Sequence, residues 1–235
     1  MLELRKSADR GYGHHAWLET YHSFSFATYY DPAQMDFGPL RVINEDIIEG
    51  GHGFTMHGHN NMEIVTYVLA GALEHQDSMG HTSVLQYGDV QRMSAGHGLK
   101  HSERNHSASE PLHLLQIWLT PNAIDIAPSY QEKHFDVASK QHRLRLIASP
   151  DGRKGSLSLA QDALLFAGIL APSDRIHYRM AVDRIAYLHV ARGTLCVNGV
   201  QLLAGDALKI GDEDGLLMDK ALDAEILLFD MALTL

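Results

Sequence analysis

The chain has 235 residues, of which 45% are apolar, and carries a formal net charge of −10. This apolar content suffices for a packed core and excludes a disordered chain, while the acidity disfavours broad binding to the phosphate backbone of nucleic acids. The single cysteine, Cys196, excludes a disulfide scaffold and a cysteine-rich zinc module. We expect no membrane contact and a cytoplasmic location, because the first residues do not resemble a signal peptide and no apolar run is long enough for a span.

Short alternating runs separated by Gly, Asn, Asp and Pro predict an all-β protein. The first half is expected to form strands over 40–48, 54–59, 63–69, 72–76, 82–86, 90–94, 99–105 and 112–120. A short helix is expected over 130–137. In the second half, strands are expected over 185–191, 194–197, 201–203, 207–210 and 225–230. No segment has the long 3.6-residue period of an amphipathic helix.

An internal repeat relates the two halves. Residues 67–93 are similar to residues 187–210, with Gly71 matching Gly193 and the Gly88-Asp89 pair matching Gly205-Asp206. The second copy is shorter and contains Asn198-Gly199, a strong hairpin signal. We therefore predict two similar β-domains, residues 1–121 and 122–235, with the C-terminal segment packing back onto the first.

Histidine is unusually frequent, and 12 of the 16 histidines lie between His14 and His113. His57 and His59 are two residues apart, as are His101 and Glu103, so each pair lies on one face of a predicted strand. If the two strands face each other inside a barrel, three imidazoles and one carboxylate converge, which is a full ligand set for a divalent transition metal. With so many histidines either pair alone could be coincidence, but both flank glycine-bounded strands. An octahedral ion held by these four groups would keep two open positions and a local charge of +1, which attracts an enolate or phenolate.

The two pairs also fall within longer motifs. Gly51-x5-His57-x-His59-x3-Glu63-x7-Gly71 resembles the first cupin motif, and Gly88-x12-His101-x3-Asn105 resembles the second. The segments HHAWLETYHSFSFATYYDPAQMDFGPLRVINED, MHGHNNMEIVTYVLAGALEHQDSMG and MSAGHGLKHSERN resemble the pirin branch of the cupins over nearly all of residues 1–120.

The resemblance implies a bicupin fold of two face-to-face β-barrels with few short helices, and one metal in the N-terminal barrel. It implies that His57, His59, His101 and Glu103 bind this metal, which we expect to be Fe(II), with Mn, Ni, Co, Cu and Zn as alternatives. In many other cupins the glutamate of the first motif is the ligand, so Glu63 is the competing assignment.

The second domain is expected to bind no metal. Counting from its repeat glycines places Arg179, Met218 and Lys220 at the positions of His57, His101 and Glu103. His177 and Arg179 are left as residues that could line a vestigial cavity.

Several other residues near the site have two interpretations. Five histidines could orient the metal ligands by a hydrogen bond to the ring nitrogen that does not bind the metal, or could be ordinary surface and core residues: His52, His75, His97, His106 and His113. An aromatic cluster in the opening segment anchors that segment or covers an aromatic ligand: Phe24, Phe26, Tyr29 and Tyr30.

The resemblance implies quercetin 2,3-dioxygenase activity, in which O₂ cleaves a flavonol with loss of carbon monoxide. Our own hypothesis is that Glu103 accepts the hydroxyl proton, since a carboxylate within reach can act as a general base. The family resemblance also implies an alternative, a non-enzymatic, iron-dependent regulator that binds a transcription factor or a metabolic enzyme. A metal-dependent isomerase is the third hypothesis. We expect a monomer whose partners are a flavonol and O₂, with a protein partner under the regulator hypothesis.

Overall fold

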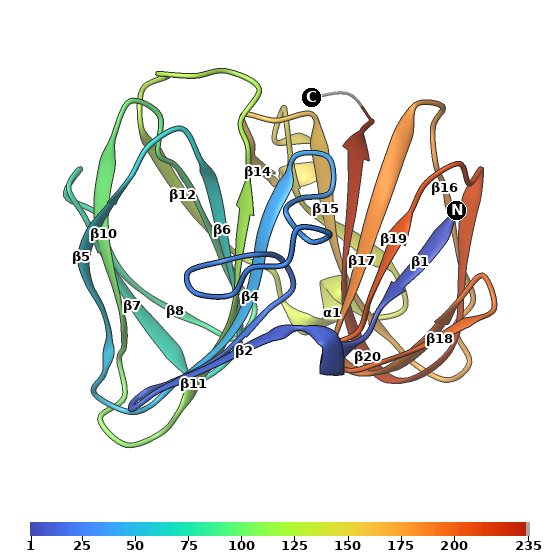
Figure 1. The fold of residues 1–235 in the computed structure, drawn as a ribbon, viewed down its shortest axis with the longest axis horizontal. Coiled ribbons are helices and arrows are strands. Elements are labelled where there is room, and N and C mark those ends of the chain that lie inside the picture. Colours follow the sequence, from blue (N-terminus) through green and yellow to red (C-terminus); the bar gives the residue numbers. More distant parts are fainter. Residues whose placement is uncertain (234–235) are drawn as a thin grey trace. The chain divides into compact units, whose positions relative to one another are not determined.

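The computed structural model describes residues 1–233, and these fold almost entirely into β-strands (Figure 1). The internal contacts divide the chain into two compact units. We call the first, residues 11–134 and 157–161, the N-terminal barrel, and the second, residues 1–10, 135–156 and 162 onward, the C-terminal barrel. The predicted all-β class with two β-units is confirmed.

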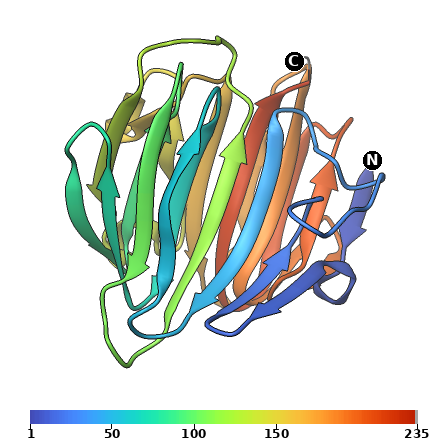
Figure 2. The same ribbon diagram turned by 60° about the vertical axis from the view of Figure 1, so that its left-hand side comes forward.

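The N-terminal barrel consists of two antiparallel sheets, which can be followed in Figures 1 and 2. The first has the strand order β12-β9-β6-β11-β4-β3-β2 and the second the order β5-β10-β7-β8. The strands are β2 (Gly11–His15), β3 (Leu18–His22), β4 (Leu40–Ile48), β5 (Gly53–His59), β6 (Glu63–Ala70), β7 (Ala72–Asp77), β8 (Thr82–Gln86), β9 (Asp89–Ser94), β10 (Leu99–Asn105), β11 (Leu112–Leu119) and β12 (Ser129–His134).

The inner face of the larger sheet is apolar towards both strand ends and polar in the middle. On β6 the alternating inner residues are Ile64, Thr66 and Val68, and on β11 they include Leu114 and Gln116. The apolar residues belong to two separate core clusters. Since a buried polar group is stable only with a hydrogen-bond partner, the central polar row must be matched by the opposite sheet.

The C-terminal barrel has the strand order β1-β19-β17-β20-β15-β13, with β16 paired to β20 and β18 to β17. Its elements are β1 (Leu2–Arg5), the 3-10 turn η1 (Ser7–Asp9), α1 (Val137–Lys140), β13 (Leu144–Ser149), the 3-10 turn η2 (Arg153–Gly155), β15 (Ala163–Leu170), β16 (Ile176–Arg179), β17 (Arg184–Val197), β18 (Val200–Leu203), β19 (Ala207–Ile210) and β20 (Gly215–Ala232). The two-residue strand β14 (Leu157–Ser158) lies within the N-terminal barrel residues.

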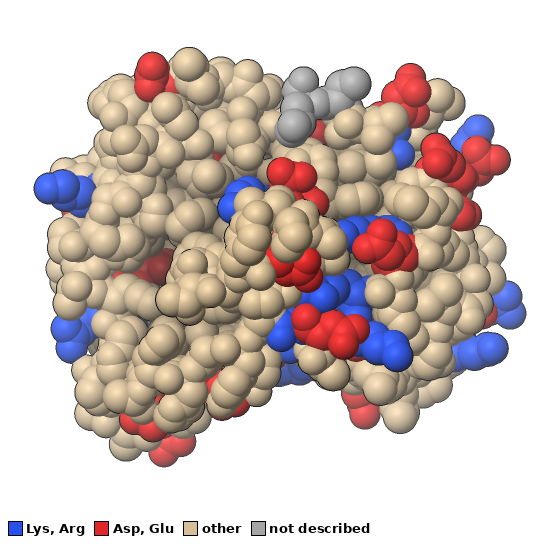
Figure 3. Space-filling view, in the orientation of Figure 1, with Lys and Arg blue, Asp and Glu red and all other residues tan. Residues whose placement is uncertain are grey.

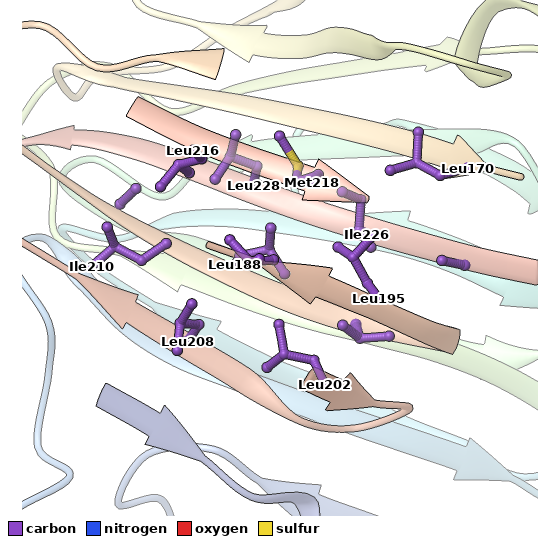
Figure 4. Close-up of a cluster of buried hydrophobic side chains, with 14 of the residues drawn as sticks. Leu170, Leu188, Leu195, Leu202, Leu208, Ile210, Leu216, Met218, Ile226 and Leu228 are labelled. Atoms are coloured by element: carbon purple, nitrogen blue, oxygen red, sulfur yellow. The ribbon is translucent and has the colours of Figure 1, made fainter. Parts of the chain in front are cut away.

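The interior of the C-terminal barrel is filled by a cluster of sixteen buried hydrophobic residues, most of them labelled in Figure 4. Met218, at the position matched to His101, belongs to this cluster, and Lys220 is exposed. His177 and Arg179 are also exposed, so the suggestion that they line a vestigial cavity is wrong. Their neighbours on β16, Ile176 and Tyr178, pack on the core instead, because successive side chains of a strand alternate between faces. The absence of a metal from the second barrel stays a prediction.

One further prediction about the chain is wrong. The expected helix over 130–137 is mostly strand β12, because residues 129–134 pair with β9, and only Val137–Lys140 is helical. The C-terminal segment forms β20, which pairs with β15, β16 and β17; its expected packing onto the first unit stays a prediction. The N-terminal strand β1 belongs to the C-terminal barrel, where it pairs with β19. The domain boundary after residue 121 stays a prediction, although contacts group residues 122–134 with the N-terminal barrel.

The internal repeat appears in the turns. Gly71 and Gly193 have φ of 79° and 69°, and Gly88 and Gly205 have φ of 96° and 81°. The aspartate after each of the latter glycines accepts a hydrogen bond from a backbone N–H three residues before it, at 2.7 Å for Asp89 and 2.9 Å for Asp206. The matched residues therefore form the same loop in each half.

Replacing Gly193 with alanine is expected to lower the free energy of unfolding by about 3 kcal/mol. Alanine is strained in the left-handed backbone conformation of this residue, and its Cβ clashes with neighbouring atoms. This Cβ would collide with the carbonyl oxygens of Leu222 and Asp223. Gly199→Ala is the control, because Gly199 has φ of 85° but no atom within 4 Å of the added Cβ. It should lower stability by only about 1 kcal/mol. Equal losses in urea unfolding would show that the clash at Gly193 relaxes.

Acidic and basic side chains are mixed on the face shown in Figure 3, rather than gathered into one continuous basic area. Among the described residues, no helix is both long and apolar enough to span a membrane.

Candidate metal centre

The four predicted ligands lie on two neighbouring strands of the smaller sheet. β5 carries His57 and His59, and β10 carries His101 and Glu103. His101 lies directly opposite His57, and a bulge between His101 and Glu103 places Glu103 opposite Phe54. The alternation of side chains and this register direct both pairs to the inner face of the barrel.

Three imidazoles converge as predicted. Ring centroids are 4.5 Å apart for His57 and His101, and 4.9 Å apart for each of the other two pairs. One nitrogen of each ring lies within 4.8 Å of those of the other two. Among the described residues these three form one of two groups close enough to hold a metal ion, and the other consists of His75, His101 and Glu103.

The closest nitrogens test whether a cation fits. Nε2 of His59 lies 3.0 Å from Nε2 of His101. Two neutral rings that both present lone pairs at this distance repel, whereas a shared cation would stabilise them. Two nitrogens bound at right angles, with bonds of about 2.1 Å, would lie about 3.0 Å apart. The residues therefore fit a divalent transition metal.

The protonation state of the rings also suits a metal. Nδ1 of His57 donates a 2.7 Å hydrogen bond to the Thr55 carbonyl oxygen, which leaves Nε2 with its lone pair free. Burial, with the neighbouring histidines, lowers the pKa of His59 to about 4 and that of His101 to about 3. Neutral imidazoles at physiological pH are the form that binds metal ions.

Glu103 lies beside this cluster and is fixed from the opposite sheet. Its Oε1 accepts hydrogen bonds from Gln91 at 2.5 Å and Thr66 at 3.2 Å, and its Oε2 accepts one from Gln116 at 2.7 Å. These donors are the polar row of the larger sheet, which is thereby satisfied. Burial raises the pKa of Glu103, against the opposing effects of His75 and the hydrogen bonds. The ligand atoms of Glu103, His101 and His75 lie within 4.8 Å of one another, and these three residues form a group that does not include His57 and His59.

Glu63, the competing ligand, faces a different environment. It is 1% exposed, and its Oε2 accepts a hydrogen bond from the Ala160 backbone at 3.0 Å. Arg92 and Ser94 are its other charged and polar partners. Glu63 belongs to neither metal-binding group of the described residues and does not line the cavity described next. This geometry favours Glu103.

The three histidines and Glu103 line a cavity of about 590 Å³ within the N-terminal barrel. Its walls include the aromatic residues Trp17, Phe26, Phe54 and Trp118. The Trp118 ring stands edge-on to His59, with centroids 4.9 Å apart. The opening segment thus contributes Trp17 and Phe26 directly to the wall. Of the predicted aromatic cluster only Phe26 lines this cavity, while Phe24 is buried at 1% exposure, so the interpretation as a cover for a ligand is supported for Phe26 alone.

A row of polar residues on β3 and β4 lines the same cavity and was missed in the sequence. Nδ1 of His22 donates a 2.7 Å hydrogen bond to Oδ1 of Asn44. Asp46 lies two residues further along β4, and burial raises its pKa to about 7, against a hydrogen bond from Thr20. The available signal was the buried alternation of Asn44 and Asp46 within an apolar strand.

A two-barrel all-β protein with a three-histidine centre in the cavity of one barrel is a metal-binding bicupin. The comparisons narrow this class. The Pirin family model matches residues 4–119, and the model of the quercetinase C-terminal cupin domain matches residues 146–231. The chain is 46% identical to quercetin 2,3-dioxygenase of Escherichia coli K12, over 98% of this chain and 99% of the relative. The chain belongs to the pirin family.

Solved structures agree with this assignment. The crystal structure of YhhW from E. coli has a TM-score of 0.95 at 44% identity, covering 98% of this chain and 97% of that one. The same bacterial pirin, solved in complex with nickel(II), also has a TM-score of 0.95 at 44% identity and covers 99% of both chains. A pirin-like protein of Caulobacter vibrioides is 40% identical over 97% of this chain and 99% of its own length.

Proposed function

We propose that this chain is a metal-dependent dioxygenase that cleaves a flavonol such as quercetin with O₂. The observation that supports this most directly is a three-histidine cluster opening onto a cavity with aromatic walls. The relative that is 46% identical is named quercetin 2,3-dioxygenase, and it matches nearly the whole chain. In the overall reaction both oxygen atoms of O₂ enter the cleaved product, and one ring carbon leaves with its oxygen as carbon monoxide.

We propose His57, His59, His101 and Glu103 as the ligands and Fe(II) as the native ion, because three imidazoles and a carboxylate suit it. Nickel(II) is the ion of the related E. coli structure and is the first alternative. When bound, the metal would supply positive charge for the substrate anion and open positions for the reactants.

The chain's own residues would orient the substrate and manage its proton. The aromatic side chains Trp17, Phe26 and Trp118 offer flat apolar surfaces for a planar polyphenol. Asn44 and Asp46 offer hydrogen-bonding groups for its outer hydroxyls. Glu103 would accept the proton of the hydroxyl that reaches the metal, since a carboxylate within reach can act as a general base.

All residues that line the cavity lie between His15 and Trp118. The proposed site is therefore complete within one N-terminal barrel, as the expectation of a monomer requires.

The direct test is metal analysis of anaerobically prepared protein, followed by O₂ uptake and carbon monoxide release with quercetin. Equal amounts of O₂ consumed and carbon monoxide released are expected. Stoichiometric metal without turnover of quercetin or related phenols would favour the iron-dependent regulator, and a pull-down of protein partners would then follow. Absence of metal after reconstitution would contradict the ligand assignment.

Glu103→Gln is expected to weaken metal binding at least about tenfold and to abolish turnover, because the amide supplies neither the anionic ligand nor the base. Glu63→Gln is the matched control, since Glu63 is the other buried glutamate of this barrel. It should keep both metal and turnover. Nickel(II) titration and O₂ uptake on both variants measure this. Full metal content and activity in Glu103→Gln, with loss in Glu63→Gln, would reverse the assignment.

A further inference from the structure

His75 is a fully buried imidazole that the proposed ligand set leaves unused. It lies on β7, directly opposite Glu103 of β10, with 0% exposure. Its ring stacks on Tyr130 with centroids 4.7 Å apart, and its centroid is 5.8 Å from that of His101. Neither ring nitrogen has a hydrogen-bond partner among the described residues. A buried polar ring without a partner is costly, so His75 calls for a physical explanation.

A charged group lies on one side of His75. Oδ2 of Asp77 is 3.5 Å from Nε2 of His75, and the Asp77 side chain is buried. Asp77 accepts hydrogen bonds from the backbone of Met79 at 2.9 Å and of His81 at 3.0 Å, and from Nδ1 of His81 at 2.9 Å. Burial tends to raise the pKa of Asp77, but these hydrogen bonds outweigh it and hold the pKa below its usual range. Asp77 is therefore an anchored anion facing His75.

A proposed metal ligand lies on the other side. Nε2 of His101 faces His59, while its Nδ1 is buried and has no partner among the described residues. A nitrogen of His75, a nitrogen of His101 and a carboxylate oxygen of Glu103 all lie within 4.8 Å of one another. The two rings thus lie beside each other in a buried space, and each has an unpartnered nitrogen.

We propose that His75 is a positioning residue: Nδ1–H of His101 donates to His75, and Nε2–H of His75 donates to Asp77. This inference rests on the proposed role of His101 as a ligand. A metal-binding histidine commonly donates its far N–H to a carboxylate or carbonyl, which fixes the ring and makes the ligating nitrogen more basic. Here a second imidazole extends that connection to Asp77, because Nδ1 of His101 has no hydrogen-bond partner of its own among the described residues.

The test compares His75→Leu with His75→Gln by nickel(II) titration and by the visible absorption of the cobalt(II) form. Leucine fills the space but breaks the connection, so nickel(II) affinity is expected to fall about 10- to 100-fold and the cobalt(II) bands to shift. Glutamine can accept from His101 and donate to Asp77, so it should restore affinity and bands to near wild-type values. His106→Gln is the control, because His106 is 53% exposed and paired with Glu74.

Four results separate the hypotheses. Failure of the wild-type protein to bind metal would contradict the proposed centre itself. Normal binding and normal spectra in His75→Leu would overturn the positioning role. Loss of binding in both His75 variants would make His75 a ligand, in the group with His101 and Glu103, and would also overturn it. If His75→Leu does not fold, Asp77→Ala removes the acceptor at the far end of the connection, and unchanged affinity and spectra there would overturn the inference.

Discussion

His57→Ala is expected to lower the affinity for nickel(II) or iron(II) by more than about 100-fold and to abolish O₂ uptake with quercetin. Loss of a metal ligand should reduce metal affinity more than loss of a residue that hydrogen-bonds to a ligand, which typically reduces it 10- to 100-fold. His57 is the most exposed of the three clustered histidines, so its replacement leaves the packed core unchanged. Isothermal titration of the metal-free protein measures the affinity.

The control for this variant is His106→Ala, which removes an exposed histidine of the same barrel outside the cavity. It should bind metal and turn over quercetin like the wild type. The thermal unfolding temperature of metal-free His57→Ala should equal that of the metal-free wild type, since the ring makes one hydrogen bond to Thr55. Wild-type affinity in His57→Ala would remove His57 from the ligand set.

Much of the three-histidine cluster could be predicted because it depends on local periodicity. Spacing of two residues places His57 with His59, and His101 with Glu103, on one strand face. The register could not be predicted, since it depends on the pairing of β5 with β10 and on the bulge after His101. That bulge offsets Glu103 from the histidines of β5, whereas the regular pairing of β10 with β7 places Glu103 opposite His75.

The partners of Glu103 come from strands distant in sequence, which explains why they were missed. Gln91 and Gln116 lie on β9 and β11 and meet Glu103 only when the two sheets pack. Gln116 is a polar residue at an inner position of the largely apolar strand β11, and this was the available signal, whereas β9 is mostly polar and offered none for Gln91. Thr66 on β6 has the same character. A polar residue centred on the buried face of a strand therefore indicates a polar group across the core.

The fold was predicted best where turns have chemical markers. The loops at Gly88-Asp89, Asn198-Gly199 and Gly205-Asp206 bound strands that match their predicted ranges closely. Strands β1 to β3 and β12 to β16 were missed. Among them β15 has an apolar pattern that could have been used, since it is largely buried between β20 and β13. The strands β1, β2, β12 and β16 have edge or solvent-facing positions that leave little apolar alternation. Their pairing is set by the neighbouring strand and not by their own pattern.

Asp46→Asn is expected to make the metal-free protein increasingly more stable than the wild type as pH rises from about 4 to about 7. Burial raises the pKa of Asp46 from 3.8 to about 7, and nearby Glu103 adds to the rise. Because the folded pKa lies above the unfolded one, the folded wild type binds the extra proton and loses stability as pH rises through this window. The shift of about 3 units corresponds to about 4 kcal/mol, which asparagine avoids because it stays neutral.

Urea unfolding of both proteins at pH 4, 5.5, 7 and 8 measures this difference, which should level off above pH 7. Asp174→Asn is the control, because the pKa of Asp174 is shifted in the opposite direction to that of Asp46. Burial would raise the pKa of Asp174, but hydrogen bonds from the Ala171 backbone and the His142 ring hold it below its usual range. Asp174 is thus charged in both states over most of this range, and its variant should differ from the wild type by a constant amount between pH 5.5 and 8. A pH-independent difference for Asp46→Asn would show that Asp46 is ionised in the folded protein, and the cavity wall facing the proposed substrate would then be anionic instead of a neutral hydrogen-bonding surface for phenolic hydroxyls.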